Sequence, residues 1–300
     1  MKYTYDEFKK IAGKSLKEEA VTDGVFVIHI HDLDLFDQLI NSMGRMSRAI
    51  YRGMNNSKEE LLSTIFREPF RWFKKEAEKK GKRKEEFLER CLEHFKYAMR
   101  SRTKMNIENL PNNEIWALGR HYGLLTPLLD WTYSPYVALF FALLSNDDST
   151  PRSVICLKKN EIEEDERYQQ YDDSYYLKKN QDIKGKTVKE NIAFLPPNEY
   201  NSLGFFSPLS NENPRLISQA GLFTVSRNDL SIQEWVRTHF KGINGPGKWV
   251  LMEIHFTANY EERTHHLRKL NRMNINYATL FPDLEGAALY TNMQMTISHY

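Results

Sequence analysis

The longest apolar run in the chain, YVALFFALL at 136–144, constrains the fold more than any other segment. It is shorter than the ~18 apolar residues that a membrane span requires. Because it is apolar on every side, it predicts a helix buried within a globular core, and Pro135 suits the first turn of that helix. A chain of 300 residues is long enough to surround such a helix with other elements. We therefore expect a globular protein without a membrane-spanning segment.

Charge and cysteine content narrow the class of protein further. The 42 basic and 40 acidic residues leave a formal charge of only +2, which predicts no strong field for DNA or an anionic membrane. Cys91 and Cys156 lie in apolar contexts, so no disulfide framework is expected. The first residues, MKYTYDEFKK, lack the apolar centre of a signal peptide. These features predict a cytoplasmic protein with no membrane partner.

Strand and helix patterns mix along the chain without regular βαβ alternation. Strand patterns occur at 24–30, 47–53, 153–159, 216–226 and 248–256. Helix patterns occur at 84–100, 114–123, 134–144, 232–240 and 258–274, with a last helix after Pro282. We also expect a charged helical region at 57–84 and a surface excursion at 161–190. The mixture predicts a single α+β domain over 1–300, with a mixed or antiparallel central sheet flanked by helices.

Polar residues precede the apolar helix in the segment LLDWTYSP. In an extended segment Asp130, Thr132 and Ser134 share one face, and they would lie near the amino end of the helix, where anions bind favourably. An alternative is purely structural, with Ser134 as the N-cap and Asp130 as a turn residue.

Arg52 follows the apolar residues of a predicted strand and precedes Gly53. An arginine among apolar neighbours requires a carboxylate or a bound anion, unless it simply lies at the surface at a strand end. Arg215 and Gln219 would share one face of the strand predicted near 216–226, which suggests a polar cavity.

Acidic and histidine residues offer further candidates. Asp283 and Glu285 are either paired acids or the first-turn acids of a helix that begins after Pro282. His29 and His31 alternate on a strand, a spacing that can chelate a metal, but no compact set of acids or histidines completes a site. No metal is therefore expected, and a metal-dependent hydrolase is the weakest hypothesis.

Four segments resemble the successive motifs of the FRG domain family, which takes its name from a Phe-Arg-Gly signature. They are YRGM (51–54), RHYGLLTPLLDWTYSPYVALFFA (120–142), NPRLISQAGLF (213–223) and NYATLFPDLEG (276–286). The resemblance extends over about 20–295. Tyr51 replaces the signature phenylalanine, and Arg120 stands where the family usually has glutamine. The resemblance implies a bacterial protein connected with mobile elements, toxins or phage.

A weaker resemblance connects YRG (51–53) and TYSPYVALFFA (132–142) to ADP-ribosyltransferases. It implies an ADP-ribosyltransferase-like fold in which Arg52 pairs with the NAD pyrophosphate and the hydroxyls hold the nicotinamide ribose. The strand that should carry the catalytic glutamate has none, so we expect Glu285 to serve as the acid, with Asp283 as its neighbour and Asp130 in reserve. An RNA 2′-phosphotransferase would instead use Arg52, His121 and Arg215.

Together the residues and resemblances predict an NAD-directed ADP-ribosyltransferase or NAD glycohydrolase that acts as a bacterial toxin or anti-phage effector. The alternative is a non-catalytic FRG module that binds a nucleotide, a nucleic acid or a phage protein; the protein or RNA target stays open. The expected catalytic residues are Arg52, His121, Asp283 and Glu285. The expected ligand-binding residues are Tyr51, Gly53, Tyr122, Asp130, Thr132, Ser134, Arg215 and Gln219.

Overall fold

The computed structural model describes residues 4–43, 49–67, 84–102, 110–164, 203–208, 214–226, 230–245 and 247–300. Most of the expected charged helix at 57–84 and of the excursion at 161–190 lies outside these ranges. Within them, no helix is both long enough and apolar enough to cross a lipid bilayer.

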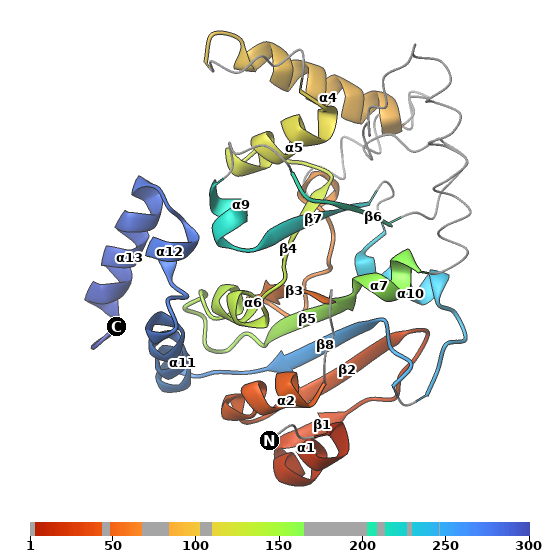
Figure 1. The fold of residues 1–300 in the computed structure, drawn as a ribbon, viewed down its shortest axis with the longest axis vertical. Coiled ribbons are helices and arrows are strands. Elements are labelled where there is room, and N and C mark those ends of the chain that lie inside the picture. The colour runs from red at the N-terminus through yellow and green to blue at the C-terminus, as the bar shows by residue number, and fades with distance from the viewer. Residues whose placement is uncertain are drawn as a thin grey trace.

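A single mixed sheet contains all the strands of the described residues (Figure 1). The strands are β1 Leu16–Glu18, β2 Val25–Ile30, β3 Ala49–Met54, β4 Leu128–Thr132, β5 Arg152–Lys158, β6 Leu203–Phe206, β7 Gly221–Ser226 and β8 Leu251–Phe256. Their order is β1-β2-β8-β5-β3-β4-β7-β6. Only β2 and β8 pair in parallel, and the other neighbours are antiparallel. The mixed sheet with its flanking helices agrees with the expected α+β class.

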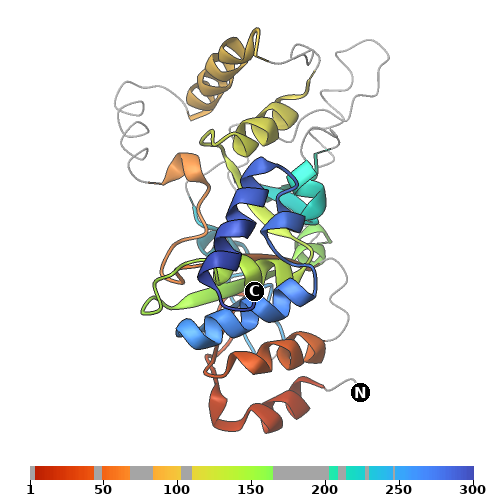
Figure 2. The ribbon, with the colours of Figure 1, turned by 90° about the vertical axis from the view of Figure 1, so that its left-hand side faces the viewer.

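Helices cover both faces of this sheet. They are α1 Tyr5–Ala12, α2 Phe36–Ser42, α4 Lys84–Met99, α5 Asn112–His121, α6 Pro135–Ala142, α7 Lys159–Glu163, α9 Pro214–Ser218, α10 Ile232–His239, α11 Tyr260–Arg272, α12 Tyr277–Leu280 and α13 Leu284–Thr296. Short 3₁₀ helices occur at Gly13–Ser15, Leu33–Leu35 and Thr64–Phe66. Three hydrophobic cores hold the helices on the sheet. The first joins α1, α2, α6 and α11 to it, and the second joins α10 to it. The third joins α4 and α5 to β4 and β7. Figure 2 shows α11, α12 and α13 grouped on one side of the molecule.

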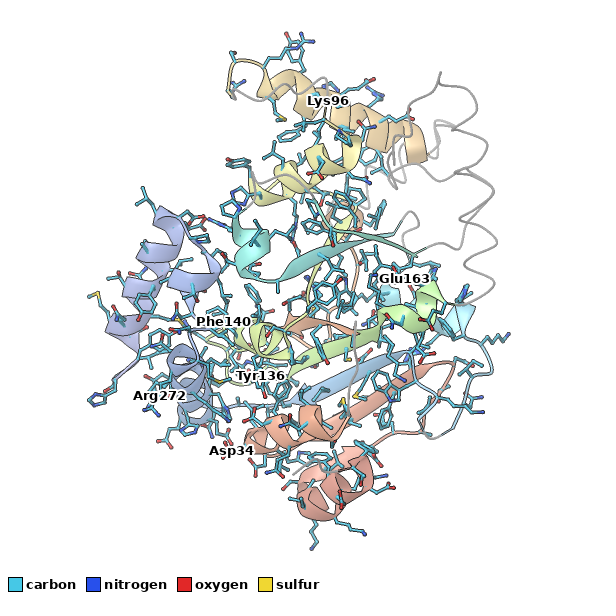
Figure 3. All side chains as sticks on the ribbon, viewed as in Figure 1. Asp34, Lys96, Tyr136, Phe140, Glu163 and Arg272 are labelled. Carbon is cyan, nitrogen blue, oxygen red and sulfur yellow. The ribbon has the colours of Figure 1, made fainter. Side chains whose placement is uncertain are left out.

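The apolar helix predicted from the sequence is α6, and it is buried as expected. Phe140 is fully buried against the ring of Tyr277, and Tyr136 contacts Phe36 (Figure 3). The helix lies directly on β3 because position 53 is glycine: a Cβ there would lie 1.9 Å from the carbonyl oxygen of Ala138. The YRG signature therefore has a packing role, in which Gly53 lets a helix backbone touch a strand.

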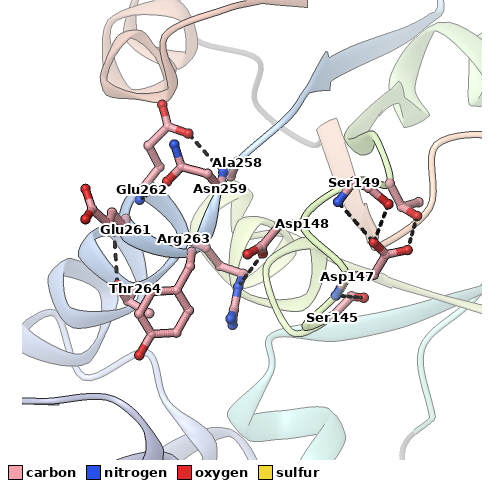
Figure 4. Close-up of polar contacts among 12 residues, drawn as sticks. Ser145, Asp147, Asp148, Ser149, Ala258, Asn259, Glu261, Glu262, Arg263 and Thr264 are labelled. Carbon is pink, nitrogen blue, oxygen red and sulfur yellow. Dashed lines mark hydrogen bonds and ion pairs between the residues drawn. The ribbon is translucent and has the colours of Figure 1, made fainter.

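A buried arginine fixes the turn that follows α6. Arg152 is fully buried and donates hydrogen bonds to the carbonyl oxygens of Ser145, Asp147 and Ala258. Beside it, Nε of Arg263 donates to Asp148 over 3.2 Å (Figure 4). These contacts tie the α6–β5 turn to the start of α11, and they hold α6 in place from its carboxyl end.

The strand predicted at 216–226 is wrong over its first half. Residues Pro214–Ser218 form the short helix α9, and the strand β7 begins only at Gly221. Ala220 closes the turn with a φ of 46°, in the left-handed region. Arg215 and Gln219 are therefore four residues apart on a helical turn, where they share a face by helical rather than strand geometry.

Candidate functional site

A cleft opens where two central strands separate. β3 and β4 pair at a single position, Tyr51 with Thr132, and the rest of the two strands is unpaired with each other. The cleft has a volume of about 1220 Å³. Its walls come from β3, β4, the end of α5, α9, and the segment between α12 and α13.

Every predicted site residue except Ser134 lines this one cleft. Those residues are Tyr51, Arg52, Gly53, His121, Tyr122, Asp130, Thr132, Arg215, Gln219, Asp283 and Glu285. They come from positions more than 230 residues apart in the chain, so the fold brings together candidates that the sequence could only name one by one. Their chemical roles stay predictions.

One wall of the cleft holds two arginines around a single carboxylate. Nη2 of Arg120 donates to Asp130 over 2.8 Å, and Nη1 of Arg52 lies 3.5 Å from the same carboxylate. Arg52 also reaches across the strand gap and donates to the carbonyl oxygen of Asp130 over 2.6 Å. Nε of Arg52 is buried with no hydrogen-bond partner among the described residues. This wall therefore carries one excess positive charge, and its guanidinium groups are not saturated.

The pKa values in this wall follow from burial and from the shared carboxylate. Burial lowers the pKa of Arg52 to about 10, and Asp130 acts in the opposite direction. Burial would raise the pKa of Asp130, but Arg120 and Arg52 outweigh it, so that the pKa falls below its usual value. All three groups are charged at neutral pH.

A second wall of the cleft reverses this stoichiometry, because two carboxylates surround one arginine. Nε of Arg215 donates to Asp283 over 2.6 Å, and its Nη2 donates to Glu285 over 2.5 Å. The guanidinium carbon also lies 4.9 Å from the ring centre of Phe281. This wall carries one excess negative charge. The predicted acids thus lie in the cleft, and each is ion-paired in this structure.

Asp283 and Glu285 also fulfil the structural alternative considered from the sequence. The Asp283 carboxylate caps α13 by accepting from the backbone of Gly286, and Glu285 lies in the first turn. The hydrogen bonds from Arg215 and Gly286 lower the pKa of Asp283. A Cβ at position 286 would lie 1.8 Å from the carbonyl oxygen of Phe281, so Gly286 permits the tight turn that presents both acids.

His121 lies at the end of α5, lines the cleft and is close enough to the charges of the second wall to be influenced by them. Burial lowers the pKa of His121, with Arg215 as the next contribution, while Asp283 and Glu285 oppose the shift. The imidazole is therefore neutral at pH 7 and can accept a proton. Gln219 faces the same wall and donates from Nε2 to the carbonyl oxygen of Leu280 over 3.0 Å.

The two predicted hydroxyl groups have structural partners instead of forming a common ligand face. Oγ1 of Thr132 donates to the carbonyl oxygen of Gln219 over 2.6 Å and accepts from the backbone of Ser134. Ser134 lies after β4, and its Oγ caps α6 by accepting from Val137. The expectation that both hydroxyls extend one strand face was wrong, because the strand ends at Thr132. The N-cap alternative for Ser134 was right, whereas Asp130 lies within β4 and not in a turn.

Several lining residues were not predicted. They are Met54, Asn55, Glu59, Arg67, Arg120, Gly123, Trp131, Phe141, Leu144, Leu216, Phe223 and Phe281. Arg120 is the most consequential, since its partner Asp130 lies only ten residues later. The signal in the sequence that could have identified Arg120 was its place at a position where the FRG family usually has glutamine. The aromatic rings gave none, because phenylalanine in an apolar context looks like core.

Of the two histidines considered for metal binding, His29 lies on β2 and His31 follows the end of this strand. Nε2 of His29 lies 3.2 Å from Glu19, and its ring stands 5.2 Å from that of His255. No group of three or more histidine, cysteine, aspartate or glutamate side chains suited to a metal ion occurs in the described part of the chain.

Comparison with known proteins finds a similarity in one segment of the chain. No curated protein and no solved structure matches the chain, and nothing in the comparisons supports the likeness to ADP-ribosyltransferases. Residues 47–150, from β3 through the end of the α6 turn, match the FRG domain. That span contains Arg52, Arg120 and Asp130, the whole of the positively charged wall. The chain is therefore similar to the FRG domain over residues 47–150, and the rest of its fold lies outside this match.

Proposed function

We propose that the cleft binds NAD and acts on its N-glycosidic bond, as an NAD glycohydrolase or an ADP-ribosyltransferase. The observation that carries the proposal is the opposite charge of the two walls. Two guanidinium groups share one carboxylate on the Arg52 side, and two carboxylates share one guanidinium on the Arg215 side. NAD has the same polarity, with an anionic pyrophosphate and a cationic nicotinamide ring.

Size and lining support a ligand of this class. Pockets for drug-sized molecules enclose about 300–1,000 Å³, and this cleft of about 1220 Å³ has room for a dinucleotide. The rings of Phe141, Phe223 and Phe281 line it and offer apolar surface to planar groups. Arginine binds phosphate oxygens through paired donors, which suits Arg52 and Arg120 to the pyrophosphate.

The proposed reaction breaks the bond between C1′ of the ribose and the nicotinamide nitrogen, and the bonding electrons leave with nicotinamide. Glu285 or Asp283 stabilises the positive charge that develops at C1′. Water attacks C1′, and neutral His121 accepts its proton. In a transferase, a nucleophile of a target molecule takes the place of water.

Nicotinamide release from NAD by the purified protein tests this proposal. Arg52→Ala should abolish release, and Glu285→Gln should lower it by ~100-fold, as is typical for loss of a positioned catalytic group. Arg237, exposed on α10 outside the cleft, supplies the control Arg237→Ala, which should keep full activity. If Glu285→Gln keeps full activity while Asp130→Asn does not, the assignment of Glu285 as the acid is wrong.

The ion pairs of Asp283 and Glu285 favour a second function, in which the protein is a non-catalytic binding module. Both carboxylates are held by Arg215, and the hydroxyls of Thr132 and Ser134 are engaged by the backbone. A module would bind NAD or another nucleotide, measured by isothermal titration calorimetry, with no nicotinamide release. The same protein preparation thus separates the two functions.

A role as a toxin or anti-phage effector would follow from NAD consumption in the cell. Expression of the wild-type chain in bacteria should then deplete cellular NAD and arrest growth, whereas Arg52→Ala should do neither. Growth arrest with undiminished NAD would contradict this role.

A further inference from the structure

A second cavity lies between the sheet and the two helices nearest the N-terminus, α1 and α2 (Figure 1). Its volume of about 770 Å³ is typical of small-molecule sites, which enclose about 300–1,000 Å³. Its floor is the apolar face of the sheet, where Phe26 of β2 pairs with Met252 of β8, and Trp249 extends this floor just before β8. Among the described residues, none lines both this cavity and the cleft, so a ligand here leaves the cleft free.

Two ammonium groups of the protein already lie against aromatic rings in the second cavity. Nζ of Lys158 lies 4.2 Å from the ring centre of Trp249, and Nζ of Lys9 lies 5.6 Å from that of Tyr5. Aromatic faces attract cations, and the attraction is stronger where the ring is shielded from water. The lining therefore has the chemistry that binds alkylammonium groups.

Carboxylates outnumber these ammonium groups in the second cavity. Its charged lining residues are Asp6, Lys9, Glu18, Glu19, Lys158 and Glu161. Together they carry an excess of two negative charges. A cavity with this excess attracts cations and repels phosphates and carboxylates, so its charge is complementary to a cationic ligand.

The strand order places these acids at two ends of the apolar floor. Glu18 ends β1, whereas Glu161 lies on α7, directly after β5. Burial, Glu18 and Asp6 all raise the pKa of Tyr5, which places Asp6 at the Glu18 end. The strands β2 and β8 lie between β1 and β5, so three strand spacings, about 14 Å, separate the two ends. A single ammonium group cannot contact both.

Each end of the second cavity has a different unmet need. At the β1 end, Lys9 is the one basic lining residue, with its Nζ 2.6 Å from Glu18, and it leaves the negative excess uncompensated. At the β5 end, Nζ of Lys158 lies 4.0 Å from Glu161, but Oδ1 of Asn160 is buried with no hydrogen-bond partner among the described residues. The first end therefore requires a positive charge, and the second requires a hydrogen-bond donor.

We propose that the second cavity binds a linear aliphatic diamine or polyamine. One terminal ammonium pairs with Asp6 and Glu18, and the methylene chain covers Phe26 and Met252. The other ammonium donates to Oδ1 of Asn160 and pairs with Glu161. Such a ligand meets both needs at once, and its chain removes apolar floor from water. The site is separate from the cleft and does not depend on any reaction there.

Three simple amines test the proposal by isothermal titration calorimetry of the full chain without NAD. The probe is 1,8-diaminooctane, which should bind at submillimolar concentration. Its first comparator, 1-aminooctane, has the same chain but one charge, and it should bind at least about fivefold more weakly. The second, 1,4-diaminobutane, has both charges but is too short to reach both ends, and it should bind at least about tenfold more weakly.

Variants that remove one acid from each end locate the ligand. Asp6→Asn should weaken both diamines about threefold, whereas Glu161→Gln should weaken only 1,8-diaminooctane by this factor, because the short diamine occupies the β1 end alone. Glu89→Gln makes the same change at an exposed glutamate of α4, outside the cavity, and should leave binding unchanged.

Thermal melts of the three variants control for folding. Four results would each overturn the proposal: no binding of 1,8-diaminooctane at millimolar concentration, equal binding of 1-aminooctane, equal binding of 1,4-diaminobutane, or equal effects of Glu89→Gln and Glu161→Gln.

Discussion

At the scale of single residues, the positive wall depends on the carboxylate of Asp130. Arg52 and Arg120 both pair with it, so removal of either arginine leaves the carboxylate with one partner. Removal of the carboxylate leaves two guanidinium groups close together with no counter-charge. The three side chains are therefore unequal in their effect on stability, although they form one cluster.

Asp130→Asn should lower the free energy of unfolding by about 1–2 kcal/mol. A fully buried pair would cost roughly 3–5 kcal/mol, but the Asp130 side chain is 42% exposed, so water screens the loss. Arg120→Ala should cost less than Asp130→Asn, because Asp130 keeps Arg52. Urea unfolding followed by circular dichroism measures both. The opposite ranking would show that Asp130 is not the shared anion of this wall.

The lowered pKa of His121 predicts a pH dependence with a definite sign. The folded protein takes up this proton less readily than the unfolded chain does. The resulting stability is complete above the ordinary histidine value of 6.5 and is lost as the pH falls through the lowered folded value. The lowered pKa values of Asp130 and Asp283 add further losses at more acidic pH.

If His121 accepts the proton of water, nicotinamide release should fall on the acidic side of pH 6.5, as the imidazole becomes protonated. His121→Gln should lower the rate and remove this acidic limb, while leaving the binding of NAD nearly unchanged. Rates measured between about pH 5 and pH 8 decide the point. A limb that persists in the variant would assign it to another group.

At the scale of elements, the contact between β3 and α6 explains why position 53 is glycine. A Cβ at position 53 would lie 1.9 Å from the carbonyl oxygen of Ala138 and 2.7 Å from the amide nitrogen of Ala142. Both atoms belong to a helix backbone, which cannot yield as a side chain could. This contact fixes the position of β3, and β3 in turn holds Arg52 at the cleft.

Gly53→Ala should therefore lower the free energy of unfolding by about 3 kcal/mol, at the upper end for overpacking, because α6 must move away from β3. Met54→Leu is the control on the same strand, and as a volume-conserving change it should cost less than about 1.5 kcal/mol. Thermal unfolding measures both variants. A Gly53→Ala protein as stable as the control would mean that α6 does not lie as close to β3 as described.

The elements show where prediction from sequence succeeds. The fully apolar α6 and the β-branched strands β3 and β5 were predicted because burial leaves a plain pattern. α9 was missed because a helix of five residues is too short to show helical periodicity, and Ile217 made it look like a strand. The pairing of Arg120 with Asp130 was missed because it depends on how α5 turns back onto β4. The candidate residues were recognised one by one, but only the fold shows that they share a cleft.

At the scale of the whole molecule, the FRG match covers less structure than the fold requires. Residues 47–150 include β3 and β4 but end before β5, which pairs along the whole length of β3. They also omit β7, the other neighbour of β4. A fragment with these boundaries would keep α6 on one face of β3, but it would expose the face of both strands that packs against α10 and leave one open edge on each strand.

A 47–150 fragment should therefore fail to fold on its own. We expect no cooperative thermal transition and poor dispersion of its amide resonances, in contrast to the chain of 300 residues. Circular dichroism and a ¹H–¹⁵N correlation spectrum make the comparison. A cooperative transition in the fragment would show that the matched segment is an independent domain.

The residues of the two walls of the cleft are also synthesised at different times. Glu285 lies 135 residues beyond the end of the FRG match, and synthesis at 5–20 residues per second takes roughly 7–27 s to cover that distance. During this interval the ribosome carries a nascent chain with Arg52, Arg120 and Asp130 but neither Asp283 nor Glu285. Because the positive wall precedes the negative one, an incomplete polypeptide lacks the acids on which the proposed reaction depends. If the protein consumes NAD as proposed, this activity can therefore begin only when translation is nearly finished.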